Sequence, residues 1–405
     1  MLRWLPIAFL ATSANASALP AREPPTKVVE RASTCTPVAG NSGSTDDVPA
    51  LQSAIAACPS GTIYIPASTT YYVNSVFDLT GCSGCTLQLE GTLKIASDTD
   101  YWNGKTAQIL VEDITGLTIT SSTGSGLIDG NGQDAYDRFA EDSSYDRPTM
   151  LYISGTSTEI AVTNLQLKNP PNVFVSATSG TSNIDFSDLN LSATSKSDND
   201  AKNTDGFDIS GSYVTMSNID ITNDDDCIAF KPGANYVTVT DVTCTGSHGL
   251  SVGSLGSEHG ATDTVSNIYV NGATMIDSTK AAGIKLYPAG DDHGTAVVKN
   301  VTWENVVVDN TDYAFQIQSC YGEDTDYCDD SPSTATLTDI VVKGFSGTTS
   351  DKYDPTVANI NCPAAGTCDV TLSSMTVKAP SGSATYLCAD TPSSLGVTCS
   401  SGASG

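Results

Sequence analysis

The sequence has few charged residues, and positive charge is especially scarce. Charged residues make up 16% of the 405 residues, and 18 Lys and Arg stand against 46 Asp and Glu, for a net charge of −28. Such a chain repels nucleic-acid phosphates, so no nucleic-acid partner is expected. It would also repel a polyanionic sugar, unless the protein works in acid or cations gather in its cleft.

Long apolar runs are absent after the first residues. Met1-Leu2-Arg3, the apolar run 4–11 and small residues up to Ala18 are typical of a secretory signal peptide, too short to span a membrane. We therefore predict a signal peptide over 1–18, a mobile N-terminus over 19–34, and a secreted, extracellular monomer with no membrane association. In a eukaryotic host, Asn190 and Asn300 would be glycosylation acceptors.

Metal-binding cysteine patterns are lacking, although the chain has twelve cysteines. Only Cys82 and Cys85 have CxxC spacing, and no second pair completes a zinc site, so no metal is expected. An even number of cysteines favours disulfides in an oxidising compartment. Pairing of sequence neighbours predicts Cys227–Cys244, Cys362–Cys368 and Cys388–Cys399. The same rule would pair Cys35 with Cys58, Cys82 with Cys85 and Cys320 with Cys328, although one sequence leaves this connectivity open.

Helical periodicity is nearly absent after residue 60. One helix is predicted over 46–58, where Asp46 or Asp47 can cap and Leu51, Ala54 and Ile55 form an apolar stripe. Beyond it, short β-rich phrases recur at irregular intervals of 20–40 residues, a pattern typical of a solenoid. Their anchors are Ile184, Met216, Val239, Ile268, Val301 and Ile340.

An antiparallel sandwich or barrel would also give short strands, but hairpin turns of the Asn-Gly type are few. We predict an all-β, single-domain right-handed parallel β-helix over 35–400, with a short N-terminal capping helix. Polar insertions over 133–146, 192–202 and 321–333 fit loops that build a cleft on one side.

Three chemically active residues recur at near-equal intervals. Asp205 precedes Asp226 by 21 residues, and His248 follows it by 22. One coil per interval would stack these groups, together with Asp208, Asp224 and Asp225. Clustered carboxylates suit glycoside hydrolysis or calcium binding, and can also form a solvated acidic turn. Lys285, one coil further, is a cation able to neutralise a substrate carboxylate.

Four short strings carry a resemblance to a known family. Asn203-Thr204-Asp205, Asp225-Asp226-Cys227, Ser247-His248-Gly249 and Ile284-Lys285 resemble, in order and spacing, the motifs of family 28 glycoside hydrolases, the polygalacturonase group. The resemblance covers about 35–400 and implies a secreted, inverting hydrolase of pectin without a cofactor. It implies that Asp225 is the general acid and that Asp205 and Asp226 activate water. It also implies that His248 adjusts the protonation and hydrogen bonding of the acid. Substrate-binding residues implied or considered are Lys285, Tyr321, Asn203 and Gly283.

Three departures from the family pattern bear on the substrate. Gly283 stands where the family has Arg, Asp224 precedes the paired acids, and the loop after Tyr321 is rich in acids. Loss of the Arg would leave space and remove a charge, which suits a substituted chain. The sequence around these motifs resembles that of a fungal subgroup of the family that hydrolyses xylogalacturonan. We therefore expect endo-hydrolysis of α-1,4 galacturonosyl linkages in xylose-substituted galacturonan. Gly283 could instead serve a tight turn, and the loop could be a pinned surface loop or bind calcium.

Other functions remain open from the sequence. The first alternative is exo- or endo-polygalacturonase activity on unsubstituted polygalacturonate. A calcium-dependent pectate lyase and a non-catalytic β-helix are the others, and the paired acids beside a His speak against both. Neighbouring coils lie about 4.8 Å apart, and carboxylates that close usually indicate retention. Inversion therefore depends on the resemblance alone.

Overall fold

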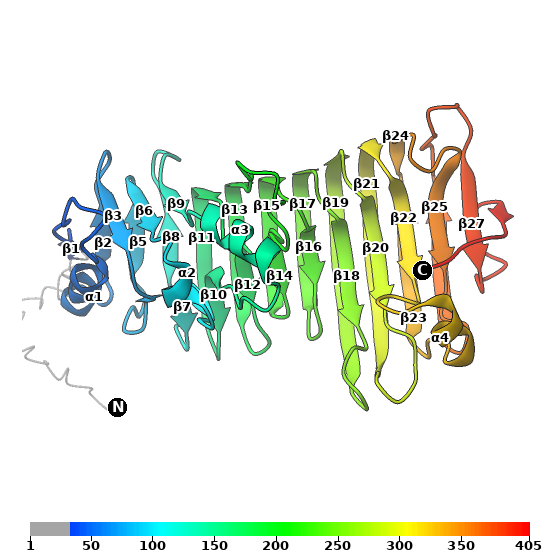
Figure 1. Cartoon of the computed structure of the whole chain (residues 1–405), viewed down its shortest axis with the longest axis horizontal. Coiled ribbons are helices and arrows are strands. Elements are labelled where there is room, and N and C mark those ends of the chain that lie inside the picture. The colour runs from blue at the N-terminus through cyan, green and yellow to red at the C-terminus, as the bar shows by residue number, and fades with distance from the viewer. Residues whose placement is uncertain (1–32) are drawn as a thin grey trace, which may run out of the picture. The chain divides into compact units, whose positions relative to one another are not determined.

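The strands of this chain stack in parallel, coil upon coil. The computed structural model describes residues 33–405, whose strands form one sheet of 16 and one of 12. Figure 1 shows them side by side from the blue, N-terminal end to the red, C-terminal end. The fold is the predicted right-handed parallel β-helix, and residues 33–405 form one compact unit.

The larger sheet holds the long strands of the middle coils. Its strands are β1 (Thr34–Cys35), β2 (Thr62–Ile65), β3 (Thr70–Val73), β5 (Thr86–Leu89), β6 (Thr92–Ile95), β8 (Thr118–Thr120), β9 (Leu127–Asp129), β11 (Thr158–Lys168), β13 (Ser182–Ser192), β15 (Ser212–Thr222), β17 (Asn235–Thr245), β19 (Thr262–Ile276), β21 (Thr295–Thr311), β23 (Thr336–Lys343), β24 (Ser346–Thr349) and β26 (Thr367–Ser373).

The smaller sheet carries the candidate site. Its strands are β4 (Phe77–Asp78), β7 (Ala107–Glu112), β10 (Thr149–Ser154), β12 (Val175–Ala177), β14 (Phe207–Ile209), β16 (Asp226–Phe230), β18 (Gly249–Leu255), β20 (Lys280–Leu286), β22 (Tyr313–Gln318), β25 (Thr356–Asn361), β27 (Thr385–Ala389) and β28 (Cys399–Ser400).

Alternation of apolar and polar residues sends one side of each strand of the larger sheet into a common core. Val214, Val237 and Ile268 are direct partners on successive coils, and each is at most 1% exposed. The anchors Met216 and Val239 were therefore placed two residues out of register with Ile184 and Ile268. The error arises because a period of two makes either inward position look alike in sequence.

Polar ladders follow the coils on the outside. Asn300 donates its side-chain amide to Asn267 at 2.8 Å, and Asn267 donates to Asn235 at 2.8 Å. Both Asn267 and Asn300 have positive φ, 57° and 54°, a conformation that Asn tolerates better than most residues. Stacked Asn side chains thus turn the chain at the same point in consecutive coils, as their repetition in the sequence indicated.

The predicted helix is α1 (Val48–Ala57), and it covers the N-terminal end of the stack (Figure 1). Leu51, Ala54 and Ile55 are buried, as expected. Asp47 is the N-cap residue, yet its side chain makes no capping bond, because its carboxylate accepts from Gly40 and Tyr72.

Three further helices were missed: α2 (Thr99–Trp102), α3 (Gln133–Glu141) and α4 (Thr325–Asp330). Two of them lie in segments that were predicted as polar loops, 133–146 and 321–333. All three are short, with at most nine residues, and the two in these segments are mostly polar, which favoured their interpretation as loops.

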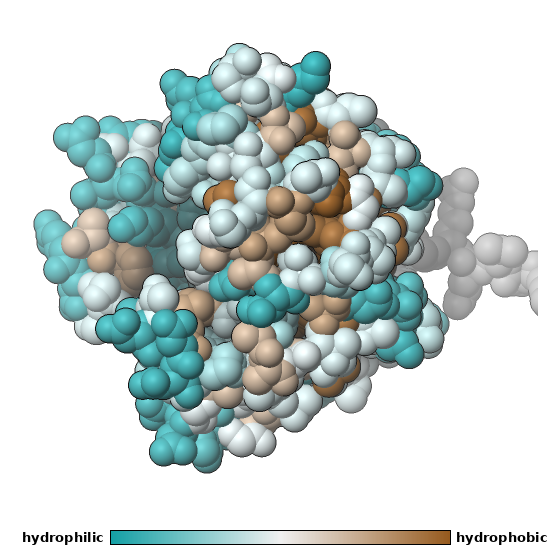
Figure 2. Space-filling view, turned by 90° about the vertical axis from the view of Figure 1, so that its right-hand side faces the viewer, coloured by the Kyte–Doolittle hydropathy of each residue, from teal (hydrophilic) through white to brown (hydrophobic). Residues whose placement is uncertain are grey.

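The C-terminal residues close the other end. Figure 2 looks onto that end, where apolar residues gather toward the middle of the face. Leu395 is 2% exposed, and its carbonyl accepts from the amide of Leu372 at 2.7 Å. Gly405 returns to the smaller sheet, where its carbonyl accepts from Cys320 at 3.0 Å.

All twelve cysteines are paired, in the six combinations of sequence neighbours. Cys82 and Cys85 bond to each other, so they offer no thiolate for zinc. The predicted signal peptide, 1–18, and most of 19–34 lie outside the described residues. Thr34 in β1 is paired with Thr62 in β2, so this residue of the segment predicted to be mobile lies in a strand.

Candidate active site

Three carboxyl groups from two successive coils meet at the smaller sheet. Asp205 precedes β14 and Asp226 begins β16, and oxygens of Asp205, Asp225 and Asp226 lie within 4.8 Å of one another. The backbone explains the alignment, because Gly206 donates to the carbonyl of Asp226 and His248 to that of Asp225, at 3.0 and 2.7 Å. The sequence interval of one coil is confirmed.

These groups open into a polar cavity of about 410 Å³. Its lining combines acids, cations and aromatic residues. The lining residues are Phe139, Tyr145, Asp146, Arg147, Asn172, Val173, Asn203, Asp205, Asp208, Asp225, Asp226, Lys231, Ser254, Lys285 and Tyr321.

Asp225 is held by donors on both oxygens. Its Oδ1 accepts from the backbone of Asp226 at 2.8 Å and lies 3.2 Å from Nδ1 of His248. Its Oδ2 accepts from the amide of Asn203 at 3.1 Å. Burial by itself would raise the pKa of Asp225, but the hydrogen bond and charge of His248, with Lys285, lower it to about 2. The carboxyl is therefore ionised near neutral pH.

Asp226 is 1% exposed and is surrounded by cations. Lys285 donates to its Oδ2 at 2.5 Å, Ser251 donates to its Oδ1 at 2.7 Å, and Lys280 lies 3.9 Å from Oδ1. Burial opposes ionisation, but the charges of Lys285 and Lys280 lower the pKa of Asp226 below its ordinary value. Lys285, expected to hold a substrate carboxylate, thus holds a carboxylate of the protein here.

Asp205 has the opposite character. Burial, followed by the charges of Asp208, Asp225 and Asp226, raises the pKa of Asp205 well above its ordinary value. Burial also raises the pKa of Asp208, against the opposing charge of Lys231, whose Nζ lies 3.5 Å from Asp208. The pKa of Asp205 is thus raised and that of Asp225 lowered, the reverse of the order that the implied roles require during the reaction.

Gly283 lies in the middle of β20 and does not line the cavity. A Cβ there would lie 2.6 Å from the carbonyl oxygen of Gln316 and 2.9 Å from Cδ of Lys280. The space that we expected to be open is therefore filled by Lys280, which donates to the carbonyl of His248 at 2.6 Å. Lys280, three residues earlier in β20, supplies the positive charge that is absent at position 283. Gly283 is required by a close approach within the sheet, not by a turn.

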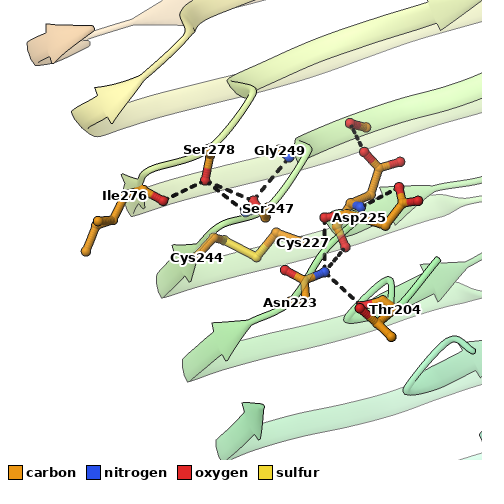
Figure 3. Close-up of a disulfide and its surroundings, with 11 residues drawn as sticks. Thr204, Asn223, Asp225, Cys227, Cys244, Ser247, Gly249, Ile276 and Ser278 are labelled. Carbon is orange, nitrogen blue, oxygen red and sulfur yellow. Dashed lines mark hydrogen bonds between the residues drawn. A yellow bond between two sulfur atoms is a disulfide. The ribbon is translucent and has the colours of Figure 1, made fainter. Parts of the chain in front are cut away.

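The bond Cys227–Cys244 joins the acidic turn to the next coil, as expected. Figure 3 shows it beside Asn223, whose amide donates to the carbonyls of Thr204, Asp225 and Asp226 at 2.8–3.0 Å. Asn223 therefore fixes the backbone of both acid-bearing coils. Nothing in the sequence distinguished this Asn from the others of the ladders.

The acidic loop after Tyr321 uses part of its charge internally. Glu323 lies 3.1 Å from Nε2 of His293, and Asp324 caps α4 by accepting from Tyr327 at 2.9 Å. With the bond Cys320–Cys328, this is a pinned loop beside the cleft. Tyr321 itself lines the cavity, 5.4 Å from Nζ of Lys285 to its ring centre.

Asp224 and the two candidate glycosylation sites lie away from the lining. The backbone of Asp224 forms an isolated parallel β-bridge with that of Lys202. Asn190 and Asn300 are exposed on β13 and β21, and Asn300 takes part in the Asn ladder.

A metal could be considered at Asp205, Asp225 and Asp226, since carboxylate oxygens are ligands of hard cations. The lysines around Asp226 and Asp208 already supply positive charge there. The donor set therefore fits an ion-paired acid cluster better than a cation cage. Among residues 33–405, no helix is long and apolar enough to cross a membrane.

Comparison with known proteins gives consistent matches. The family model "Glycosyl hydrolases family 28" matches residues 58–400. A probable endo-xylogalacturonan hydrolase A of Aspergillus flavus is 63% identical over 383 residues, 94% of each chain. The crystal structure of endo-xylogalacturonan hydrolase from Aspergillus tubingensis has a TM-score of 0.90 at 62% identity, covering 92% of this chain and all of that one. A polygalacturonase from Erwinia carotovora shares the fold, with a TM-score of 0.69 at 19% identity, over 90% of this chain and 97% of that one.

Proposed function

We propose that this chain, which belongs to glycosyl hydrolases family 28, cleaves α-1,4 galacturonosyl linkages inside xylose-substituted galacturonan. The support for this substrate is the similarity to endo-xylogalacturonan hydrolases over nearly the whole chain. The support for hydrolysis is one observation: Asp205, Asp225 and Asp226 line one polar cavity together with Lys285, and Nδ1 of His248 lies 3.2 Å from Asp225.

In the proposed reaction, Asp225 donates a proton to the glycosidic oxygen, and that bond to the anomeric carbon breaks. A water adds to the anomeric carbon and gives its proton to Asp226, assisted by Asp205. His248 holds Asp225 in place, while Lys285 and Tyr321 contact the sugar. Asn203 orients Asp225, and Gly283 admits Lys280 beneath the site.

Substrate binding would shift the pKa of Asp225 toward that of a general acid. A galacturonate carboxylate that pairs with Lys285 would draw this cation from the protein carboxylates and add negative charge beside Asp225. Both changes raise the pKa of Asp225.

We propose inversion of the anomeric centre, as the family resemblance implies. The carboxylate oxygens lie closer than the roughly 6.5–9.5 Å usual between the carboxyl groups of inverting enzymes. Proton NMR of the first product formed tests this directly. An initial product with the configuration of the substrate would mean that Asp205 or Asp226 acts as a nucleophile.

The second candidate is exo- or endo-polygalacturonase activity on an unsubstituted chain. The lysines Lys231 and Lys285 in the cavity favour it, because they suit a polymer with a carboxylate on each sugar. The acidic loop at Tyr321 disfavours such a polyanion by repulsion.

The proposal is tested by turnover of xylogalacturonan by the wild type and by Asp225→Asn, with reducing ends measured. The variant should keep the melting temperature within a few degrees and lose activity by about 10³-fold or more. Undiminished turnover by a folded Asp225→Asn protein would overturn the assignment. A chelator-sensitive, UV-absorbing product would instead identify a lyase.

We also propose that residues 1–18 are a cleaved signal peptide and that 35–400 act as an extracellular, monomeric catalytic domain. The signal-like sequence and six disulfides support this. N-terminal sequencing of the secreted protein and its mass in solution test it. Mass spectrometry before and after glycan removal tests occupancy at Asn190 and Asn300.

A further inference from the structure

Arg147 is a buried cation that the proposed reaction does not use. It follows α3, lines the cavity and is 7% exposed. Its Nη1 donates to the carbonyls of Pro171 and Lys202 at 3.1 and 2.7 Å, and its Nη2 donates to Oδ1 of Asn203 at 2.7 Å. The guanidinium thus reaches three acceptors, one of which belongs to a residue that touches Asp225.

The contact with Arg147 settles how the amide of Asn203 is turned. A guanidinium has five donors and no acceptor, so only the oxygen of the amide can face it. The nitrogen must then face the other way, where it donates to Oδ2 of Asp225 at 3.1 Å. If the amide were flipped, its oxygen would face Asp225 and would accept a proton from that carboxyl.

This orientation determines which oxygen of Asp225 can deliver a proton. Oδ1 already faces the backbone N–H of Asp226 and Nδ1 of His248. Oδ2 accepts a single bond, from Asn203, and keeps a free lone pair. A transferable proton must therefore reside on Oδ2.

We infer that Arg147 is a positioning residue: by locking Asn203 as a donor, it fixes Oδ2 of Asp225 as the proton-carrying oxygen and favours the ionised form of that carboxyl between turnovers. This inference rests on the proposed role of Asp225 as the general acid. It also gives a purpose to the insertion at 133–146.

The insertion contacts both Arg147 and the loop that precedes Asn203. The guanidinium lies 3.6 Å from the ring centre of Phe139 in α3, a stacking geometry that orients its plane. Gln133 and Asp137 of the same helix bond the 195–199 loop, which leads into Asn203. Two insertions far apart in sequence therefore brace one amide.

The charged groups facing Asp225 set the sign of the test. They are Arg147, His248, Lys231, Lys280, Lys285, Asp205, Asp226 and Asp224. Loss of Arg147 removes a cation and frees Asn203 to flip, and both changes raise the pKa of Asp225. The basic limb of the kcat–pH profile, which reports protonation of the acid in the complex, should move to higher pH.

The experiment is a double-mutant cycle on xylogalacturonan with Arg147→Met and Asn203→Ala, measured as kcat over pH. Arg147→Met should reduce kcat about tenfold or more, the size of loss seen when a residue that orients a functional side chain is removed. KM should be nearly unchanged, and the basic limb of the kcat–pH profile should move to higher pH. In the Asn203→Ala background the displacement should be clearly smaller. Arg138→Met is the control and should match the wild type, because Arg138 lies in α3 and forms a partly exposed pair with Asp100.

A folded Arg147→Met protein with an unshifted limb, or an equal shift in both backgrounds, would overturn the inference. If Arg147→Met does not fold, the same cycle is run with Arg147→Lys, whose ammonium lacks the planar fork. An unshifted basic limb in the Arg147→Lys protein, or an equal shift in the wild-type and Asn203→Ala backgrounds, counts against the inference in the same way. Wild-type turnover and its loss in Asp225→Asn test the proposed function separately from these outcomes.

Discussion

Lys285 donates a hydrogen bond to Asp226 at 2.5 Å, and both side chains are less than 10% exposed. The residue expected to bind the substrate carboxylate is thus paired with a candidate catalytic residue. Binding of a sugar carboxylate has to compete with this pair, which couples substrate recognition to the charge of the acid cluster.

Replacing Lys285 by Met should lower both stability and activity. Breaking a buried ion pair from one side leaves a buried charge and costs about 3 kcal/mol of unfolding free energy. The folded-state pKa of Asp226 is lowered, so the stabilisation by this pair is present above the unfolded pKa and is lost as pH falls through the folded one. Urea unfolding at neutral and acid pH should show the cost of the substitution shrinking in acid. Lys343→Met, in the exposed pair with Glu304, should change little at any pH.

Asp205→Asn should stabilise the protein while abolishing most activity. The pKa of Asp205 is raised by burial, so its ionised form opposes folding once pH passes its unfolded value. The amide removes that charge. The melting temperature should rise by about 2 °C or more at pH 7, and the gain should vanish near pH 3. A lower melting temperature at pH 7 would mean that Asp205 is ionised and well paired.

Gly283→Ala should be poorly tolerated although Gly283 lies outside the cavity. Its new Cβ would meet a backbone oxygen at 2.6 Å and the stem of Lys280 at 2.9 Å, and such overpacking costs about 1–3 kcal/mol. Thermal unfolding measures the loss. Gly43→Ala, whose Cβ would have no neighbour closer than 3.4 Å, serves as the control. Equal stability of both variants would show that β20 shifts freely, and that a larger side chain at 283 is compatible with Lys280.

Removal of the bond Cys227–Cys244 should affect catalysis as well as stability. Its loop spans 17 residues and that of Cys388–Cys399 spans 11, so loss of either should cost about 3 kcal/mol. Only the first bond holds the turn that carries Asp225 and Asp226. Double Cys→Ser variants of each pair, compared for kcat below their melting temperatures, should show a loss confined to the Cys227–Cys244 variant. Equal kcat values would mean that Asn223 alone suffices to hold the turn.

The sequence allowed the coil architecture and the acid cluster to be predicted for the same reason. Parallel coils bring residues one period apart into contact. The intervals from Asp205 to Asp226 and from Asp226 to His248 therefore predict that these residues lie on neighbouring coils. The apolar alternation of each strand then predicts the core. Its two-residue ambiguity caused the register error at Met216 and Val239.

The supporting residues of the site were not predicted, for two different reasons. Arg147 meets Asn203 from 56 positions away, beyond the 20–40-residue intervals of the repeat. Lys280 meets His248 from 32, which is one coil, but no motif marked Lys280 as part of the site. Scarcity of positive charge was the available signal, since Arg147, Lys231, Lys280 and Lys285 all gather at one acid cluster in a chain with 18 Lys and Arg.

The most direct test of the account is product analysis on xylogalacturonan and polygalacturonate side by side, at equal uronic-acid concentration. We predict an early series of xylose-bearing oligosaccharides from the first polymer, a rapid fall in its chain length, and slow or no release from the second. Faster cleavage of polygalacturonate, or release of only monosaccharide or a single dimer without chain scission, would contradict the proposed substrate or the proposed endo mode.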